Sequence, residues 1–368
     1  MNKAINKERQ SNFELMRIVS MLFIITWHTI LHGGIFNGLG QPFSFVADTL
    51  LGILIVHVNS LVFITGYFNG DKRTINYKKV LKLCGTVWLY KVLIVLILSH
   101  FQVIILDKTT LMEELLPLDM TNYWFINCYI IVYILSPYLN RVTNDMNEKD
   151  FKRFLLILIS LLSVLPTITS NRLISNNGYN IINFTIIYYL GSYFKRYPLR
   201  NNFHFKEMST NGIRLFLIIS LISTIIIRIS LYYLGDRMCY INSGLLAYFG
   251  NIIRNSFLSY ASPLVIIQTC LYCLFFESLT IKSKLINFVS KQTMAIYLIH
   301  DNLYMRINIY KWLNVTQNTA NIYNVLFILI RTIVIIYVVA SIIEILRQFI
   351  LKVIIYVYSY LKRLKKCK

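Results

Sequence analysis

Apolar runs near or above 18 residues recur along the whole of this 368-residue chain. Such a run is long enough for a helix to cross the hydrocarbon core of a bilayer, where every backbone polar group must be satisfied within the segment. Hydrophobic residues make up 56% of the sequence, which leaves no stretch for a soluble domain of useful size. The pattern therefore predicts an all-α, polytopic protein with a single integral membrane domain over residues 1–368.

The apolar runs divide the chain into about ten predicted spans. The sixth run is short and residues 240–260 are ambiguous, so nine or eleven spans stay open. The first run carries ionisable residues and lacks a small-residue cleavage site, so we interpret it as a span and not as a cleavable signal peptide. The predicted bounds are 12–33, 44–68, 80–106, 123–139, 154–170, 181–195, 213–234, 257–277, 291–310 and 321–350, followed by a basic cytoplasmic tail over 351–368.

The distribution of basic residues indicates the orientation of these spans. Most of the 37 Lys and Arg fall in the N-terminal segment, in the loops after the even-numbered spans and in the C-terminal tail. Cytoplasmic loops are rich in Lys and Arg, so the alternation predicts an even span count with both termini cytoplasmic. The net charge of +21 then lies beside anionic membrane lipids, and no soluble basic face is long enough to bind nucleic acid. The opposite loops carry only Lys108, Arg172, Arg237, Arg254 and Lys311.

Three ionisable residues share one stripe of the first predicted span. Arg17 and His28 are eleven residues apart, which at about 100° per residue returns to the same helix face and places His28 roughly 16 Å deeper. Glu14 precedes Arg17 by three residues, close enough to pair with it. Ionisable residues within hydrocarbon usually face a protein interior or an aqueous cavity, and imidazole suits acid–base chemistry near neutral pH. We expect a functional site there; a structural polar contact between helices is the alternative.

Further polar residues interrupt two other predicted spans. His57 lies near the middle of the second span, and His300 and Asp301 fall within the ninth. A buried imidazole beside a carboxylate is a candidate for acid–base chemistry, and a structural contact between helices is again the alternative.

A cluster of cations lies between the second and third predicted spans. Cations in the first turns of a helix oppose the helix dipole unless a ligand such as a phosphate or a lipid headgroup is present. The loop therefore indicates an anion site, and ordinary cytoplasmic charge bias is the alternative. The cluster consists of Lys72, Arg73, Lys78, Lys79 and Lys82.

Four segments, in order along nearly the whole chain, resemble acyltransferase family 3 of integral membrane proteins. The family signature is an arginine followed by ten residues and a histidine, as in Arg17 and His28. Within the family the chain looks most like the membrane-only members that acetylate surface polysaccharides. The segments are Asn12-Phe-Glu-Leu-Met-Arg17 with His28, Ile64-Thr-Gly-Tyr67 before the basic loop, Tyr123-Trp-Phe-Ile-Asn-Cys-Tyr129 running to Leu135-Ser-Pro137, and Ile296-Tyr-Leu-Ile-His-Asp301.

The resemblance implies transfer of an acyl group, usually acetyl from acetyl-coenzyme A, to a sugar hydroxyl. The acceptor would be a capsular or other surface polysaccharide or its lipid-linked precursor, and the location the bacterial cytoplasmic membrane. Acyl-coenzyme A would be a substrate, with no permanently bound cofactor and no metal. Because coenzyme A cannot cross the membrane, its phosphates should dock at the cytoplasmic basic loop while the thioester reaches up between the helices.

The resemblance also implies roles for individual residues. The histidine and arginine of the family correspond to His28 and Arg17, which would act in catalysis, and Glu14 would hold the arginine in place. Lys79 and Lys82 stand where the family has paired arginines, and lysine keeps the charge but loses the bidentate geometry of arginine. Donor-binding residues would be Lys79, Lys82, Arg73 and Trp124, and an acceptor site or second polar wall would consist of His300, Asp301 and His57.

Two other classes of membrane protein remain as alternatives. A polysaccharide polymerase or flippase shares many spans and basic loops, but a polymerase is expected to carry a large outer loop with arginines. A secondary transporter is expected to show two similar halves with Gly- or Pro-interrupted spans at matching positions. Neither pattern is visible in the sequence, which favours the acyltransferase.

Overall fold

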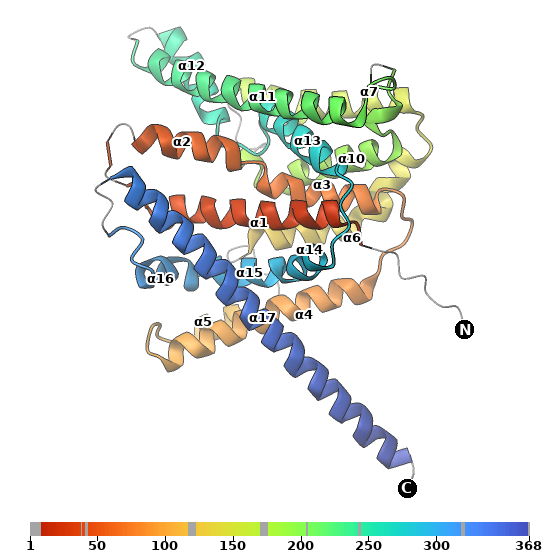
Figure 1. Cartoon of the computed structure of the whole chain (residues 1–368), viewed down its shortest axis with the longest axis vertical. Helices are drawn as coiled ribbons and strands as arrows, with labels where there is room; N and C mark the ends of the chain where they lie inside the picture. Colours follow the sequence, from red (N-terminus) through yellow and green to blue (C-terminus); the bar gives the residue numbers. More distant parts are fainter. Residues whose placement is uncertain are drawn as a thin grey trace.

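A computed structural model describes residues 9–37, 39–40, 43–116, 123–169, 176–203, 205–241, 244–317 and 321–366. These residues form helices and loops and include no strand, so the predicted all-α class is confirmed for the described part of the chain. Most of the long helices run side by side in one bundle, and the last helix crosses the others obliquely (Figure 1). The helices are α1 (Ser11–Leu31), α2 (Phe43–Leu54), α3 (His57–Asn69), α4 (Tyr77–His100), α5 (Lys108–Leu115), α6 (Trp124–Asn144), α7 (Glu148–Ile159), α8 (Leu165–Ile168), α10 (Ile181–Arg196), α11 (Thr210–Cys239), α12 (Gly244–Ser256), α13 (Pro263–Glu277), α14 (Lys284–Val289), α15 (Thr293–His300), α16 (Met305–Trp312) and α17 (Ile322–Lys366).

Six helical stretches of the described chain are long and apolar enough to cross a membrane. Helices α6, α10 and α13 fall where further spans are predicted, but α13 and α10 have only 15 and 16 residues. The protein is therefore a multi-pass membrane protein, and the count of ten spans and their orientation stay predictions. The six stretches are Ser11–Leu31, Phe43–Asn69, Tyr77–His100, Glu148–Ile168, Thr210–Cys239 and Ile322–Tyr360.

The predicted second span, 44–68, corresponds to the apolar stretch Phe43–Asn69, but it is divided into two helices, because α2 ends at Leu54 and α3 begins at His57. Buried side chains satisfy the backbone carbonyl groups at this break. Arg228 and Gln268 both donate to the carbonyl of Gly52, at 2.8 and 3.1 Å. Without such partners, broken backbone at membrane depth would be costly. The break is therefore supported by polar residues that lie far away in the sequence.

The predicted spans 257–277 and 291–310 also differ from the structure. Helix α13 begins only at Pro263, a residue suited to the first helical position because it lacks an amide hydrogen. The stretch 291–310 is divided between α15 and α16, which are separated by the loop that follows His300. Asn302 ends this loop by accepting a hydrogen bond from the amide of Tyr304 at 3.0 Å.

Two glycines allow α3 and α10 to pack with their backbones in contact. A Cβ atom added to Gly66 would collide with the backbone carbonyl of Tyr188, and one added to Gly191 would collide with that of Phe63. Small residues at such crossings are the usual means of close helix packing in membranes. This contact fixes α3, which carries His57 at its first position.

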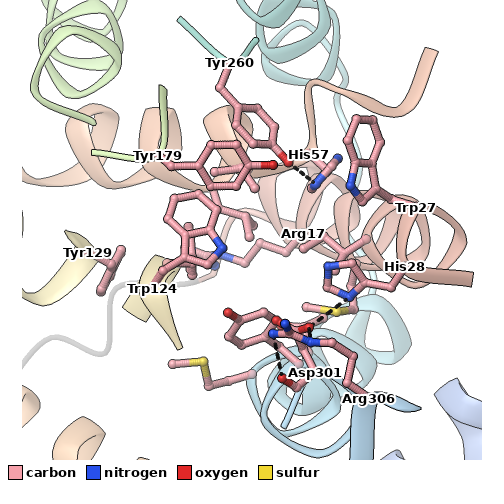
Figure 2. A pocket seen from close by; sticks show the side chains of 18 of the residues that line it. Arg17, Trp27, His28, His57, Trp124, Tyr129, Tyr179, Tyr260, Asp301 and Arg306 are labelled. Carbon is pink, nitrogen blue, oxygen red and sulfur yellow. Dashed lines mark hydrogen bonds and ion pairs between the residues drawn. The ribbon is translucent and has the colours of Figure 1, made fainter. Parts of the chain in front are cut away.

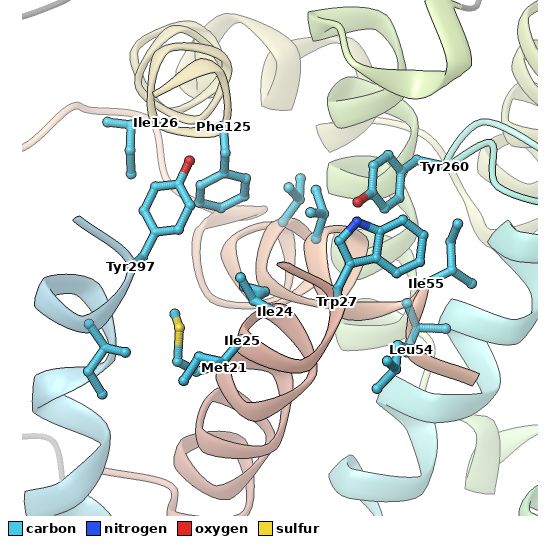
Figure 3. Packing of buried hydrophobic residues seen from close by; sticks show 14 of the residues in the cluster. Met21, Ile24, Ile25, Trp27, Leu54, Ile55, Phe125, Ile126, Tyr260 and Tyr297 are labelled. Atoms are coloured by element: carbon cyan, nitrogen blue, oxygen red, sulfur yellow. The ribbon is translucent and has the colours of Figure 1, made fainter. Parts of the chain in front are cut away.

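The core of the bundle surrounds α1. Met21, Ile24, Ile25 and Trp27 of this helix are almost entirely buried. Figure 3 shows these side chains between residues of the α2–α3 break, of α6 and of α15, with Trp27 beside Tyr260. Helix α1 is therefore central, and its polar stripe is enclosed by neighbouring helices.

The last helix extends well beyond the predicted last span. The sequence predicts a tail over 351–368, whereas α17 continues as one helix to Lys366. At about 1.5 Å per residue, its 45 residues reach roughly 68 Å, about twice the hydrocarbon thickness. Its oblique course past α1 and α4 accommodates part of this length (Figure 1).

Candidate functional site

A cavity of about 440 Å³ lies along the polar stripe of α1. Arg17 lines it toward the N-terminal part of α1 and His28 toward the C-terminal part, so the two residues of the Arg-x10-His spacing share one cavity. Residues of α3, α4, α6, α15 and α16 and of the loops before α10 and α13 complete the wall (Figure 2). The lining residues are Arg17, Met21, Ile24, Trp27, His28, Leu31, His32, His57, Val58, Leu61, Thr65, Leu83, Trp124, Phe125, Tyr129, Tyr179, Tyr260, Thr293, Met294, Tyr297, Asp301 and Arg306.

Two further cavities continue this space toward the loop between α3 and α4. The second, of about 250 Å³, shares Arg17, Thr65, Leu83 and Tyr129 with the first. The third, of about 580 Å³, shares Lys72, Lys79 and Tyr133 with the second. The three cavities form a series that begins at the cations of the loop and ends beyond His28. We call the end with Lys72 and Lys79 the basic end.

Arg17 is held in position by a carboxylate on its own helix. Its Nη1 donates to Oε1 of Glu14 at 2.6 Å, and Oγ of Ser290 donates to Oε2 of the same carboxylate at 2.5 Å. Arg9 also approaches Glu14, at 3.5 Å. Glu14 is buried and lines none of the three cavities, whereas Arg17 lines two of them. The geometry matches the expected anchoring role, and that role stays a prediction.

His28 is joined to the residues that interrupt the predicted ninth span. Nδ1 of His28 lies 3.1 Å from Nε2 of His300 and 3.5 Å from Oδ1 of Asp301. Nδ1 of His300 lies 2.6 Å from the carbonyl oxygen of Ile296. The structure therefore brings together three of the predicted site residues from opposite ends of the sequence.

The tautomers of the two imidazoles follow from these contacts. The carbonyl of Ile296 can only accept, so Nδ1 of His300 carries a hydrogen and, in the neutral ring, Nε2 is an acceptor. Nδ1 of His28 must then donate to His300, which leaves Nε2 of His28 with its lone pair. This Nε2 makes no hydrogen bond within the described residues and faces the cavity (Figure 2). A lone pair held in this way can accept a proton from a bound molecule.

Asp301 is also bound by an arginine that the sequence pattern did not place in the site. Nε of Arg306 donates to Oδ1 of Asp301 at 2.9 Å, and the side chain of Asp301 is only 2% exposed. The carboxylate thus lies between the guanidinium of Arg306 and the imidazole of His28. Its charge would stabilise His28 when the imidazole is protonated.

His57 lies on the opposite wall and is oriented in the same manner as His300. Its Nδ1 lies 2.7 Å from the carbonyl oxygen of Leu54 at the α2–α3 break, and its Nε2 lies 3.1 Å from the hydroxyl of Tyr260. Nδ1 must donate to the carbonyl, so Nε2 accepts the hydrogen of Tyr260. His57 therefore orients a tyrosine at the cavity wall and has no contact with His28 of the kind made by His300.

Only some of the predicted donor-binding residues line a cavity in the structure. Lys79 lines the second and third cavities at the basic end, and Trp124 lines the first cavity beyond Arg17. Arg73 and Lys82 are exposed and line none of the three cavities. Lys72, predicted only as a member of the cation cluster, lines two of them. All four cations are exposed, so what separates them is whether the side chain lines a cavity, and their spacing in sequence does not reveal this.

Aromatic side chains form the wall of the first cavity away from the basic end. Trp124 lies at the first position of α6, Tyr179 precedes α10, and Tyr260 precedes α13. The ring centroids of Trp124 and Tyr179 are 4.5 Å apart, and those of Tyr179 and Tyr260 are 5.1 Å apart. With Trp27, they form what we call the aromatic end. Tyr179 and Tyr260 are not among the predicted site residues, because they carry no signal beyond their position next to apolar runs.

One group of possible metal ligands occurs at the site. Ligand atoms of His28, His32 and Asp301 lie within 4.8 Å of one another. The guanidinium of Arg306 already bonds to Asp301, and its positive charge opposes a cation there. These residues therefore fit acid–base chemistry better than metal binding.

The fold and the site define a multi-pass membrane protein with a polar reaction cavity between its helices. The family model described as the acyltransferase domain, of acyltransferase family 3, matches residues 10–341, nearly the whole chain. The chain belongs to this family and is a membrane acyltransferase, which favours acyl transfer over the polymerase, flippase and transporter alternatives. Neither the comparison with curated proteins nor the comparison with solved structures found a match.

Proposed function

We propose that this protein transfers an acyl group, with acetyl as the expected group, from acyl-coenzyme A to a sugar hydroxyl of a surface polysaccharide or its lipid-linked precursor. The observation that carries the proposal is the single cavity series that joins the cations of the basic end to the oriented Nε2 of His28. A donor with an anionic head and a thin pantetheine arm suits this shape. Its phosphates would contact Lys72 and Lys79, and its thioester would pass Arg17 and reach His28.

The reaction follows from the tautomer of His28. Nε2 accepts the proton of the sugar hydroxyl while the hydroxyl oxygen attacks the thioester carbonyl, giving a tetrahedral intermediate. Cleavage of the C–S bond then expels the thiolate, which takes the proton from Nε2, so the products are an ester and free coenzyme A. Asp301 and His300 stabilise the transient imidazolium from the Nδ1 side.

The test uses purified protein in lipid nanodiscs with radiolabelled acetyl-coenzyme A and the surface glycan of the source cells. We expect His28→Gln and His28→Ala to lower transfer by at least about 100-fold, since the general base is lost. His100→Gln is the matched control, because His100 is exposed at the end of α4 and lines none of the three cavities. Transfer by the His28 variants at the rate of this control would contradict the proposed role.

A further inference from the structure

The aromatic end has the features of a binding site, and the donor would not occupy it. In the proposed function, acyl-coenzyme A enters from the basic end and brings its thioester to His28. The second substrate must then reach the same atom from another direction. The residues of the aromatic end line only the first of the three cavities, away from Lys72 and Lys79.

The rim of the aromatic end is accessible. Leu31 and Tyr179 line the cavity and are 45% and 38% exposed, and His32 beside them is also exposed. Leu31 is the last residue of α1, whereas the basic end lies beyond Arg17 near the start of the same helix. The two ends of the cavity series therefore open toward opposite ends of α1.

The polar groups that line this cavity include both acceptors and donors of hydrogen bonds. Tyr260 donates its hydrogen to His57, and its hydroxyl also interacts with that of Tyr179. Nε2 of His28 offers a lone pair, whereas Asp301 is almost completely buried and is bonded to Arg306, whose guanidinium supplies N–H donors at the cavity wall. A ligand that satisfies these groups must both donate and accept hydrogen bonds, as the hydroxyl groups of a polyhydroxylated molecule do.

The faces of Trp124 and Tyr179 add a second requirement. Figure 2 shows the two rings on one side of the cavity, with His28, Asp301 and Arg306 on the other side. An aromatic face packs against the apolar C–H face of a sugar ring. It gives little preference among linear molecules that carry the same number of hydroxyl groups. A pyranose meets both requirements, because it has an apolar C–H face and hydroxyl groups around its ring.

We propose that the aromatic end is the acceptor subsite and holds a pyranose ring against Trp124 and Tyr179, with one hydroxyl directed at Nε2 of His28. This inference rests on the proposed function, because it takes the donor to occupy the basic end. It assigns Trp124 to the acceptor, whereas the family resemblance implies that this residue binds the donor. The acceptor and the donor then meet from opposite ends of the cavity series.

The experiment compares KM values for the two substrates. The donor is acetyl-coenzyme A, and the acceptors are a panel of methyl pyranosides (hexoses, N-acetylhexosamines and uronic acids) with glycerol as a hydroxyl donor that lacks a ring. We expect Trp124→Ala to raise the KM of the preferred pyranoside at least about 10-fold and to leave the KM of acetyl-coenzyme A within about 2-fold. Trp124→Phe should give an intermediate value. Wild-type protein should prefer the pyranoside to glycerol, and Trp124→Ala should reduce this preference.

The controls separate folding from binding. Trp312→Ala changes a tryptophan of α16 that is 53% exposed and lines none of the three cavities, so both KM values should stay unchanged. A rise in the thermal unfolding temperature on addition of coenzyme A shows that each variant is folded. If Trp124→Ala does not fold, Trp124→Phe and Tyr179→Ala are measured instead, and each should raise the KM of the pyranoside.

Several outcomes would overturn the inference. They are an increased KM for acetyl-coenzyme A with an unchanged pyranoside KM, equal use of glycerol and pyranosides by the wild type, and rejection of every pyranoside by a wild type that acetylates the native glycan. Failure of the proposed function looks different, because wild-type protein would then neither bind acetyl-coenzyme A nor acetylate any acceptor.

Discussion

The neighbours of His28 determine which of its two ring nitrogens carries the hydrogen. An imidazole in a cavity can present either nitrogen, and a catalytic base needs one of them fixed. Here the carbonyl of Ile296 fixes His300, and His300 in turn fixes His28. His300 acts through another residue and is therefore a positioning residue.

The first prediction for a single residue concerns this positioning. His300→Phe removes the acceptor for Nδ1 of His28 and keeps a planar ring in the site, so His28 loses its defined orientation. We expect kcat to fall by about 10- to 100-fold, while the KM values for donor and acceptor stay within about 2-fold. Steady-state kinetics measures this separation. An unchanged kcat would show that His28 is oriented without His300.

At the scale of the helices, the site depends on two breaks between helices and on one very close helix contact. The α2–α3 break supplies the Leu54 carbonyl that orients His57, and the loop after α15 supplies Asp301. Helix α3 is held against α10 through Gly66 and Gly191. Such a contact has no room for a side chain, so its effect on stability can be tested directly.

The prediction for this helix contact compares two glycines of long helices. Gly66→Ala places a Cβ against the backbone of Tyr188, and we expect it to lower the free energy of unfolding by about 1–3 kcal/mol. Gly85→Ala in α4 is the control, since a Cβ there meets nothing within 4 Å. It should leave stability unchanged or raise it by up to about 1 kcal/mol. Unfolding temperatures in one detergent measure both, and equal values would show that α3 and α10 tolerate separation.

Across the molecule as a whole, the order of the helices decides which groups meet. The first residues of α1 and the last turns of α17 lie toward the same end of the bundle (Figure 1). The basic loop between α3 and α4 also lies toward this end, and the start of α17 lies toward the other. This arrangement is the one expected for the predicted even number of crossings, and the orientation itself stays a prediction.

The final prediction tests this orientation with single cysteines on a background that lacks the six native ones. Thr74→Cys lies in the basic loop and Lys311→Cys near the end of α16, and both positions are exposed. In right-side-out membrane vesicles, a membrane-impermeant maleimide should label Lys311→Cys at once and Thr74→Cys only after permeabilisation, because basic loops stay cytoplasmic. The reverse labelling would invert the topology and place the proposed donor entrance outside.

The membrane class, the polar stripe of α1 and the basic loop can all be predicted from the amino-acid sequence. These features depend on local properties: the length of an apolar run, the periodicity of one helix and the charge of one loop. For the same reason, the spacing of Arg17 and His28 is sufficient to place them on one face of a helix.

The groups that face this stripe are set by how distant segments pack together. His28 and His300 are 272 residues apart, and nothing in the periodicity of one helix indicates which other helix packs against it. The breaks at Leu54 and after His300 depend on polar partners such as Arg228 and Gln268 that approach from distant segments. Tyr179 and Tyr260 reach the cavity because three helix ends converge there, so the acceptor side of the site exists only in the packed bundle.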